Sequence, residues 1–195
     1  MSGFELVTIT FSFVIGLGVA QILSAASFAM RERRERPLHW LPLSIAGAIF
    51  LAHVQFWFAL FGINTVVPEW TWTSYGPLLM LAVLLFLSGG TVLPPSGSTG
   101  SLSLLEDFET RGKLSLLLLA IYMIGWIPLN VWFDEGGPNF SWTFSGVWFN
   151  LLIATSLLVA YRAKDPTTRD SAVLIFLALQ VLGVLFVWAT PDILG

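Results

Sequence analysis

The sequence contains no cysteine. This excludes disulfide bonds, thiolate nucleophiles and thiolate metal ligands, and leaves the redox compartment open. Charge is also scarce: charged residues make up 11% of the 195 residues, against about 25% in a soluble domain. Hydrophobic residues make up 56%, and the mean hydropathy is +0.81. A chain this short and apolar cannot hide its surface from water, so we expect lipid to solvate it.

Six apolar segments are each long enough to cross a bilayer as a helix, which takes about 20 residues. They cover approximately residues 4–30, 38–63, 75–93, 114–133, 142–161 and 171–190. No Lys or Arg precedes the first segment, which is also longer than the core of a signal peptide, so we interpret it as a retained span. The predicted fold is an all-α, polytopic integral membrane protein whose single domain, residues 1–195, has six transmembrane helices.

Lys and Arg are absent from both ends of the chain and from two of the five connections. All nine lie in the other three: Arg31, Arg33, Arg34 and Arg36 in the first, Arg111 and Lys113 in the third, and Arg162, Lys164 and Arg169 in the fifth. Basic residues gather on the cytoplasmic side of membrane proteins. We therefore predict that these three connections, including the loop 94–112, are cytoplasmic, that both termini are extracytoplasmic, and that the protein is multi-pass in an inner or plasma membrane.

The arginines between the first two spans form the densest charge cluster. Glu32 and Glu35 interrupt it, which argues against nucleic-acid binding. The cluster falls where phosphates of the inner leaflet are expected. We interpret Arg31, Arg33, Arg34 and Arg36 as a topology anchor in contact with lipid headgroups, and membrane lipids as partners.

The loop 94–112 has two parts. Its first half, PPSGSTGS, is typical of a flexible linker. In its second half, Ser103 followed by Glu106 predicts a capping box and a short helix. Its apolar residues Leu104, Leu105 and Phe108 could then dip into the inner membrane interface.

The sequence has no recognisable catalytic constellation. It offers no nucleophile beside a base and no paired carboxylates in the membrane. Glu106, Asp107 and Glu109 could in principle hold a hard cation, but acids in a first helical turn are more often explained by the helix dipole. We therefore predict no catalytic residue, no metal site and no enzymatic activity.

Ionisable Asp, Glu, Lys and Arg are missing from the centres of all six segments, so uncharged polar residues become the candidates for binding a ligand or lining a path. They are Gln21, His53, Gln55, Asn150 and Gln180, with Trp57 beside them. Three of these accompany stripes of small residues, which favour close helix packing. Gln55 shares a face with Ala48, Ala52 and Ala59, Gln21 lies beside Gly16, Ala20 and Ser24, and Asn150 lies between Gly146 and Ala154. We interpret Gln55 and Asn150 as interhelical hydrogen-bonding groups.

His53 lies roughly opposite Gln55, on a stripe of bulky residues. The stripe contains Ile49, Phe50, Phe56, Trp57 and Leu60. A bare histidine facing lipid is costly, so we expect His53 to have a partner: another helix, a second subunit or a bound molecule. A neutral core histidine with a hydrogen-bond partner and a functional group are both open interpretations.

The two histidines, His39 and His53, are fourteen residues apart, which returns to nearly the same helix face about 21 Å away. Such spacing resembles the histidine pairs that hold two stacked haems in b-type cytochromes. In those proteins two helices each supply a pair, so this chain would need a two-fold dimer, and His39 also suits a simple membrane-edge position. We predict no cofactor and keep haem as an alternative.

The predicted outer connections are short, acidic and aromatic. Residues 69–72 read Glu-Trp-Thr-Trp and residues 134–138 read Asp-Glu-Gly-Gly-Pro, with Tyr75, Trp132, Trp142 and Trp188 at a similar level. This pattern is typical of an interfacial aromatic belt, and an aromatic mouth for an organic solute is the alternative.

Three functional hypotheses follow. The first is a transporter-like or channel-like protein that binds or passes an uncharged or apolar solute or a lipid. The second is a non-catalytic, oligomerising or accessory membrane subunit, and a homo-oligomer is expected. The third is a b-type haem electron carrier.

Overall fold

The computed structural model describes residues 3–67, 69–95, 102–134 and 140–189. These residues form helices joined by short connections, and no strand occurs among them. In chain order the helices are α1 (Gly3–Arg31), α2 (Trp40–Val66), α3 (Trp72–Val92), α4 (Leu104–Asp107), the π-helical turn η1 (Phe108–Gly112), α5 (Leu114–Asp134), α6 (Phe140–Arg162) and α7 (Pro166–Ala189). The predicted all-α fold is therefore confirmed for the described residues.

The long helices coincide with the predicted spans to within a few residues. Five of them, α1, α2, α3, α5 and α7, are long and apolar enough to cross a membrane. Helix α6 extends from Phe140 to Arg162, and its stretch Gly146–Arg162 qualifies only as a shorter apolar helix. The architecture is thus that of a multi-pass membrane protein, while the sixth crossing and the placement of the termini stay predictions.

A polar side chain caps the start of α7. Asp165 precedes Pro166, the first residue of α7, and its carboxylate accepts the Thr168 backbone N–H at 2.9 Å and the Thr168 hydroxyl at 3.0 Å. The missing N–H of proline costs nothing at this position. The bonds that the Thr168 N–H and then its hydroxyl donate lower the pKa of Asp165. The chain can therefore reverse within three residues between α6 and α7.

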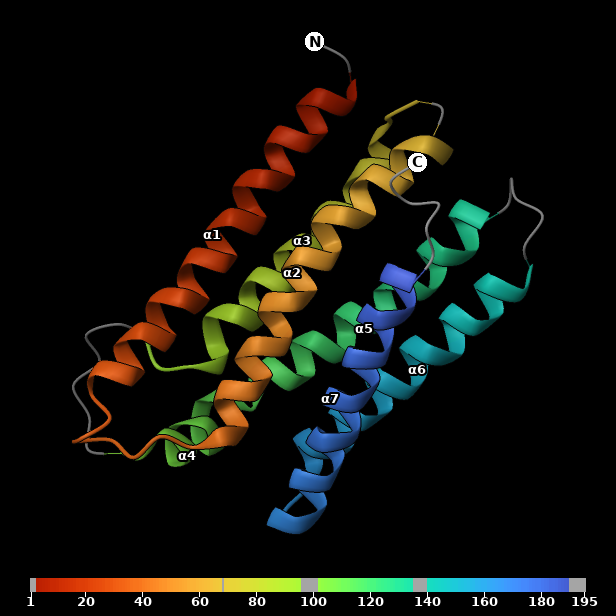
Figure 1. Cartoon of the computed structure of the whole chain (residues 1–195). Helices are drawn as coiled ribbons and strands as arrows, with labels where there is room; N and C mark the ends of the chain where they lie inside the picture. Colours follow the sequence, from red (N-terminus) through yellow and green to blue (C-terminus); the bar gives the residue numbers. More distant parts are fainter. Residues whose placement is uncertain (1–2, 68, 96–101, 135–139, 190–195) are drawn as a thin grey trace.

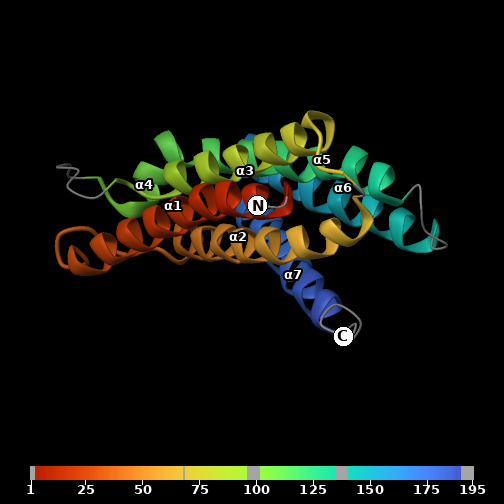
Figure 2. The ribbon, with the colours of Figure 1, turned by 90° about the horizontal axis from the view of Figure 1, so that it is seen from above.

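The helices form a bundle of neighbouring pairs. Helix α2 contacts α3, α3 contacts α5, α5 contacts α6, α6 contacts α7, and α7 returns to α2. Helix α1 packs on the edge of this ring, against α2 and α3 (Figure 1). Seen from above, the end of α7 projects away from the other helices (Figure 2). Helix α1 begins and α7 ends on the side opposite the turn between α1 and α2 (Figure 1).

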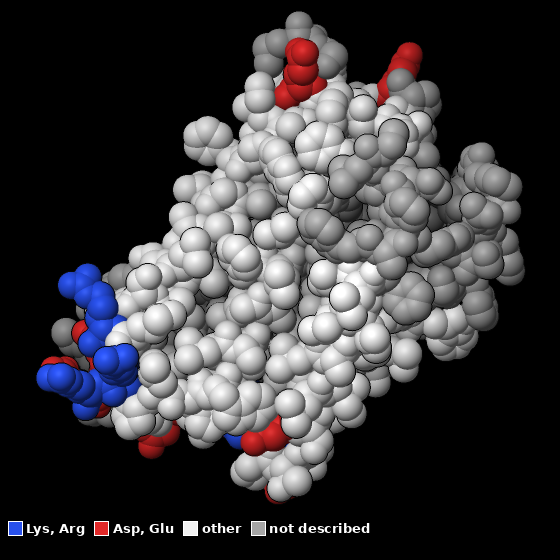
Figure 3. Space-filling model, in the orientation of Figure 1, with Lys and Arg blue, Asp and Glu red and all other residues white. Residues whose placement is uncertain are grey.

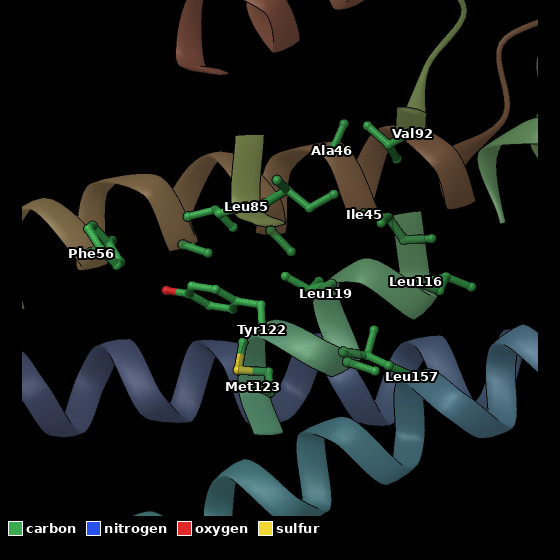
Figure 4. Close-up of a cluster of buried hydrophobic side chains, with 14 of the residues drawn as sticks. Ile45, Ala46, Phe56, Leu85, Val92, Leu116, Leu119, Tyr122, Met123 and Leu157 are labelled. Atoms are coloured by element: carbon green, nitrogen blue, oxygen red, sulfur yellow. The ribbon is translucent and has the colours of Figure 1, made fainter. Parts of the chain in front are cut away.

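The core lies where α2, α3, α5 and α6 meet. Figure 4 shows side chains from all four helices converging there, among them Phe56, Leu85, Leu119, Tyr122 and Leu157. Each of these is less than 5% exposed. Phe56 also joins aromatic rings of α1 and α5, because its ring centroid lies 5.7 Å from those of Phe11 and Trp126. Such ring contacts stabilise the packing of α2 against α1 and α5.

The structure confirms the predicted capping box at the start of α4. The Glu106 carboxylate accepts the Ser103 backbone N–H at 2.8 Å, and the Ser103 hydroxyl accepts the Glu106 N–H at 3.3 Å. The predicted insertion into the membrane interface is wrong for Leu104 and Phe108, which are 3% and 0% exposed inside the protein. The helix continues as a π-helical turn that packs Phe108 against Gly112. The expected linker at 96–101 lies outside the described residues.

Helix α1 buries a different face from the one expected. Its buried residues recur every three or four positions: Val7, Phe11, Ile15, Gly18, Ile22, Ala25 and Ala29. The small residues Gly16, Ala20 and Ser24 are exposed, so they do not form the packing face of α1 within the chain, and the expectation that they favour close helix packing stays a prediction. Apolar residues surround α1 on all sides, so their spacing in the sequence does not indicate which face is buried. That face is determined by the surfaces of α2 and α3 against which α1 packs.

Candidate functional site

Gln55 and Gln180 meet between α2 and α7. The Gln180 side-chain amide donates a hydrogen bond to the Gln55 carbonyl oxygen, with 2.6 Å between Nε2 and Oε1. Gln180 is 4% exposed and Gln55 is half-buried. An unpaired amide is costly in an apolar medium, so each glutamine favours the position in which it meets the other. Their hydrogen bond joins α2 and α7, which otherwise contact each other only modestly. The interhelical hydrogen bond expected for Gln55 is therefore present.

His53 is buried, with 1% of its surface exposed. Its Nδ1 lies 2.8 Å from the Ile49 carbonyl oxygen one turn earlier in α2. A carbonyl oxygen only accepts, so Nδ1 carries the proton, and Nε2 is left with a lone pair. Nε2 is buried and has no hydrogen-bond partner among the described residues. Most of the bulky stripe is buried: Ile49, Phe56 and Leu60 are at most 2% exposed, while Phe50 and Trp57 are half-buried.

The partner of the His53 ring is a pair of glycines on neighbouring helices. A Cβ added to Gly18 of α1 would lie 2.2 Å from Nε2, and one added to Gly89 of α3 would lie 3.6 Å from Cε1. The imidazole therefore fills a notch that exists because Gly18 lacks a side chain, while a Cβ at Gly89 would make only ordinary van der Waals contact with the ring. The Gly18 backbone faces the Nε2 lone pair, which allows at most a weak contact from Cα–H. We call this arrangement the histidine notch.

The other candidates do not join these two sites. Asn150 of α6 is half-buried, and so is Trp57 of α2, whose ring centroid lies 5.8 Å from that of Phe61. Gln21 is exposed on α1, with its amide against the backbone at Gly90. The sequence candidates thus divide into one hydrogen-bonded pair, one buried ring and three separate positions, rather than lining a shared surface.

His39 has a local role at the start of α2. It is the residue before the first helical turn, and its Nδ1 accepts the Leu41 backbone N–H at 3.3 Å. Its ring centroid lies 6.1 Å from that of Trp40. A ring that caps its own helix explains His39 without a ligand, although its other nitrogen takes no part in the cap.

At the end of the bundle that carries the turn between α1 and α2, ion pairs join the segment 102–112 to the last helix. Glu109 of η1 accepts from Lys113 at 2.5 Å and from Arg169 of α7, and Arg169 also binds Asp170 at 2.8 Å. Arg169 is 6% exposed, so its buried positive charge has to be compensated, and these two carboxylates compensate it. Lys113 Nζ also lies 3.5 Å from the carbonyl oxygen of Ala163, at the end of α6.

These contacts use two of the three acidic residues that could have held a cation, Glu106 and Glu109. Glu109 is engaged by two basic side chains, and Glu106 closes the capping box. The bonds donated by the backbone N–H and then the hydroxyl of Ser103 lower the pKa of Glu106. Among the described residues, no group of three or more His, Asp or Glu side chains is placed to hold a metal.

The arginine-rich turn between α1 and α2 is an ordered feature of the same end. Backbone N–H groups of Glu35 and Arg36 both donate to the Glu32 carbonyl oxygen at 2.9 Å. Arg36 turns inward, where its Nε lies 3.7 Å from the Glu32 carboxylate. Arg31, Arg33 and Arg34 are exposed.

Two features of the interior were missed by the sequence analysis. Gly18 gives no sequence signal, because it does not belong to the small-residue repeat formed by its neighbours Gly16 and Ala20. The Ser88 hydroxyl of α3 donates to the Ser115 carbonyl oxygen of α5 at 3.0 Å, and both residues are buried. A serine near a helix end gives no sequence signal for such a contact, because the two residues are far apart in the chain.

Comparison with known proteins adds no relationship: no protein family, curated protein or solved structure was found to match this chain.

Proposed function

We propose that the protein crosses an inner or plasma membrane six times, with both termini outside and the basic connections inside. Helix α6 supports the sixth crossing, since it is 23 residues long, about 35 Å at 1.5 Å per residue. The Lys and Arg residues on the face shown in Figure 3 gather at one end of the molecule, as the positive-inside rule expects.

The lack of native cysteine makes this topology directly testable. Single cysteines at Glu69 and Thr110, both exposed and each beyond an end of α3, would be labelled in intact cells with an impermeant maleimide. We expect labelling at Glu69 only, with Thr110 reacting after lysis. Labelling of Thr110 in intact cells would reverse the orientation.

We propose further that the protein is a non-catalytic, oligomerising membrane subunit, which associates through the exposed face of α1. The observation that carries this proposal is Gln21. Its side chain is exposed, and it makes no hydrogen bond within the described part of the chain. It lies ten residues before Arg31, about 15 Å along the helix, and therefore inside the apolar band. An amide at this depth that lies beside Gly90 of α3 without a hydrogen bond favours a hydrogen-bonding partner on another helix.

A second copy of the chain suits this face because an amide both donates and accepts. Two Gln21 side chains related by a two-fold axis could satisfy one another. Gly16 has no atom within 4 Å of an added Cβ, and Ala20, one turn further along α1, is also exposed. The two form a stripe roughly 100–140° around the helix from Gln21. Small exposed residues on this neighbouring stripe of α1 allow a second helix backbone to approach closely.

The test is disulfide cross-linking in native membranes. Ala20→Cys should give a cross-linked dimer, whereas Ala178→Cys, exposed on α7, should stay monomeric. Adding Gln21→Leu to the first variant should reduce the cross-linked fraction severalfold. Cross-linking of both cysteines to the same extent would indicate random collision and refute the α1 interface, and so would the absence of any cross-link at Ala20.

The same purified protein tests the competing functions. Binding or passage of an uncharged or apolar solute would need Gln55, His53 and Gln180 to face a path. In the present arrangement His53 and Gln180 are buried and Gln55 is bonded to Gln180, so a path requires the helices to separate. Solute-selective flux in proteoliposomes would favour transport over the subunit proposal. A haem absorbance band after expression with added haem would favour electron transfer, with His39 and His53 as the first ligands to replace.

A further inference from the structure

The contact between α1 and the rest of the bundle leaves polar atoms unsatisfied. Two buried side-chain atoms have no hydrogen-bond partner among the described residues, Thr8 Oγ1 of α1 and His53 Nε2 of α2. Nε2 faces the backbone of Gly18 in α1. Thr8 precedes the buried Ile15 and Ile22 by seven and fourteen residues, so it shares their face of α1. Buried polar atoms without a partner are rare and costly, so both atoms favour an arrangement in which α1 lies elsewhere.

The packing of α1 on α2 and α3 is apolar. All of its buried residues, from Val7 to Ala29, are apolar. Helix α1 lies at the edge of the bundle (Figure 1) and buries a smaller share of its apolar stretch than α2, α3 or α5. Lipid tails replace apolar contacts at little cost. Helix α1 can therefore separate from its neighbours more easily than helices joined by a buried hydrogen bond, such as α2 and α7.

In the histidine notch, the His53 ring has room for only one proton. Nδ1 carries it, because the Ile49 carbonyl oxygen lies 2.8 Å away. A second proton, on Nε2, would make the ring cationic and aim a buried N–H at Gly18, where no described residue offers an acceptor. The closed arrangement therefore accommodates the neutral imidazole and excludes the imidazolium.

No carboxylate on the helices that form the notch can compensate a charge on this ring. Apart from His53, α2 has no titratable residue, and α1 has Glu5 and Arg31, each thirteen residues from Gly18 and about 20 Å from it along the helix. The titratable residue of α3 is Tyr75, fourteen residues from Gly89 and about 21 Å from it. Tyr122 of α5, whose ring centroid lies 6.5 Å from that of Phe56, is uncharged near neutral pH, as is Tyr75.

We propose that His53 is a proton sensor that controls a second arrangement of the helices, in which α1 moves away from α2 and α3. Displacement of α1 opens the notch to water, which can accept a hydrogen bond from protonated Nε2 and bind the Thr8 hydroxyl. The closed arrangement binds one proton fewer than the open one. It is therefore favoured above the ordinary histidine pKa of about 6.5, and its population relative to the open one falls by up to about tenfold for each pH unit below that value. The movement lies within one chain and does not depend on whether copies associate through α1.

The protonation of His53 can be observed directly in the full chain in nanodiscs. His39→Gln leaves His53 as the sole histidine, so nitrogen NMR of histidine-labelled protein reports this ring alone. At about pH 7.5 we expect a neutral ring that is protonated on Nδ1, and on acidification a cationic ring. A neutral ring protonated on Nε2 would overturn the proposal, because the bond to Ile49 would then be wrong.

The movement of α1 is measured by distances between nitroxide labels on introduced cysteines, which are specific because the chain has none of its own. One pair joins Leu17 of α1 to Met80 of α3, and the control pair joins Met80 to Leu182 of α7; all three side chains are exposed. Dilution with unlabelled protein restricts the distances to single chains. We expect a longer Leu17–Met80 distance to gain at least about tenfold in population between roughly pH 7 and pH 5, together with protonation of the ring, while the control distance stays fixed.

Two variants separate the sensor from a general effect of acid. His53→Gln cannot take up the proton and should abolish the pH response. Gly18→Ala weakens the closed notch and should move the transition to higher pH. A cationic His53 without a change in the Leu17–Met80 distance would refute the proposal. So would a ring that stays neutral and a distance that stays constant down to about pH 5, an equal response in His53→Gln, or a Gly18→Ala transition at unchanged pH.

Discussion

The histidine notch makes a sharp prediction for Gly18→Ala. The added methyl group would lie 2.2 Å from Nε2 and 2.9 Å from Cδ2 of His53. The ring cannot swing aside without breaking its 2.8 Å contact with the Ile49 carbonyl, and its surroundings are closed because it is 1% exposed. The backbones of α1 and α2 must therefore separate.

Two effects of opposite sign determine the size of the change. Glycine to alanine in a helix interior stabilises by roughly 0.5–1 kcal/mol, while overpacking costs about 1–3 kcal/mol. A rigid ring held on two sides places this site toward the upper end of overpacking. We therefore expect Gly18→Ala to lower the free energy of unfolding by about 1–2 kcal/mol.

The assay is equilibrium unfolding in mixed micelles, with Gly47→Ala as control. Gly47 is exposed on α2 and has no atom within 4 Å of an added Cβ, so it reports the propensity gain alone. In a His53→Ala background, Gly18→Ala should cost nothing, because the clash is gone. If Gly18→Ala is as stable as the Gly47→Ala control, the packing of His53 against α1 is wrong.

Three other outcomes are expected. Gln55→Leu and Gln180→Leu should each destabilise, and a double-mutant cycle of unfolding free energies should give a coupling of about 0.6–2 kcal/mol; additive effects would contradict the hydrogen bond. Arg169→Met should cost about 1–3 kcal/mol, below the usual cost of breaking a fully buried pair because its carboxylate partners are partly exposed, whereas Arg111→Met at an exposed site should change stability by less than about 0.5 kcal/mol in the same assay. The lowered pKa of Glu106 means that its cap stabilises α4 above the ordinary glutamate pKa and is lost as pH falls through the lowered value; amide hydrogen exchange in α4 should therefore quicken only in acid, and Glu106→Gln should remove that pH dependence.

The candidate residues could be predicted by type but not by partner. Uncharged polar groups within apolar helices must be satisfied, and this requirement alone singled out Gln55, Gln180 and His53. It could not say that the first two bond to each other, because they are 125 residues apart. Nor could it say that His53 packs on Gly18, since a glycine offers no pattern that points to a ring on another helix.

The sequence by itself determined the helical class, the approximate ends of six apolar segments, the grouping of basic residues and the Ser103–Glu106 cap. These depend on length, composition and contacts between residues close in the chain. Only the tertiary structure decided which face of each helix is buried, because nearly uniform apolarity leaves the faces of α1 and α2 indistinguishable to periodicity. Packing then placed Gly16 outside and Gly18 inside, and buried Arg169 among carboxylates that lie far from it in sequence or directly beside it.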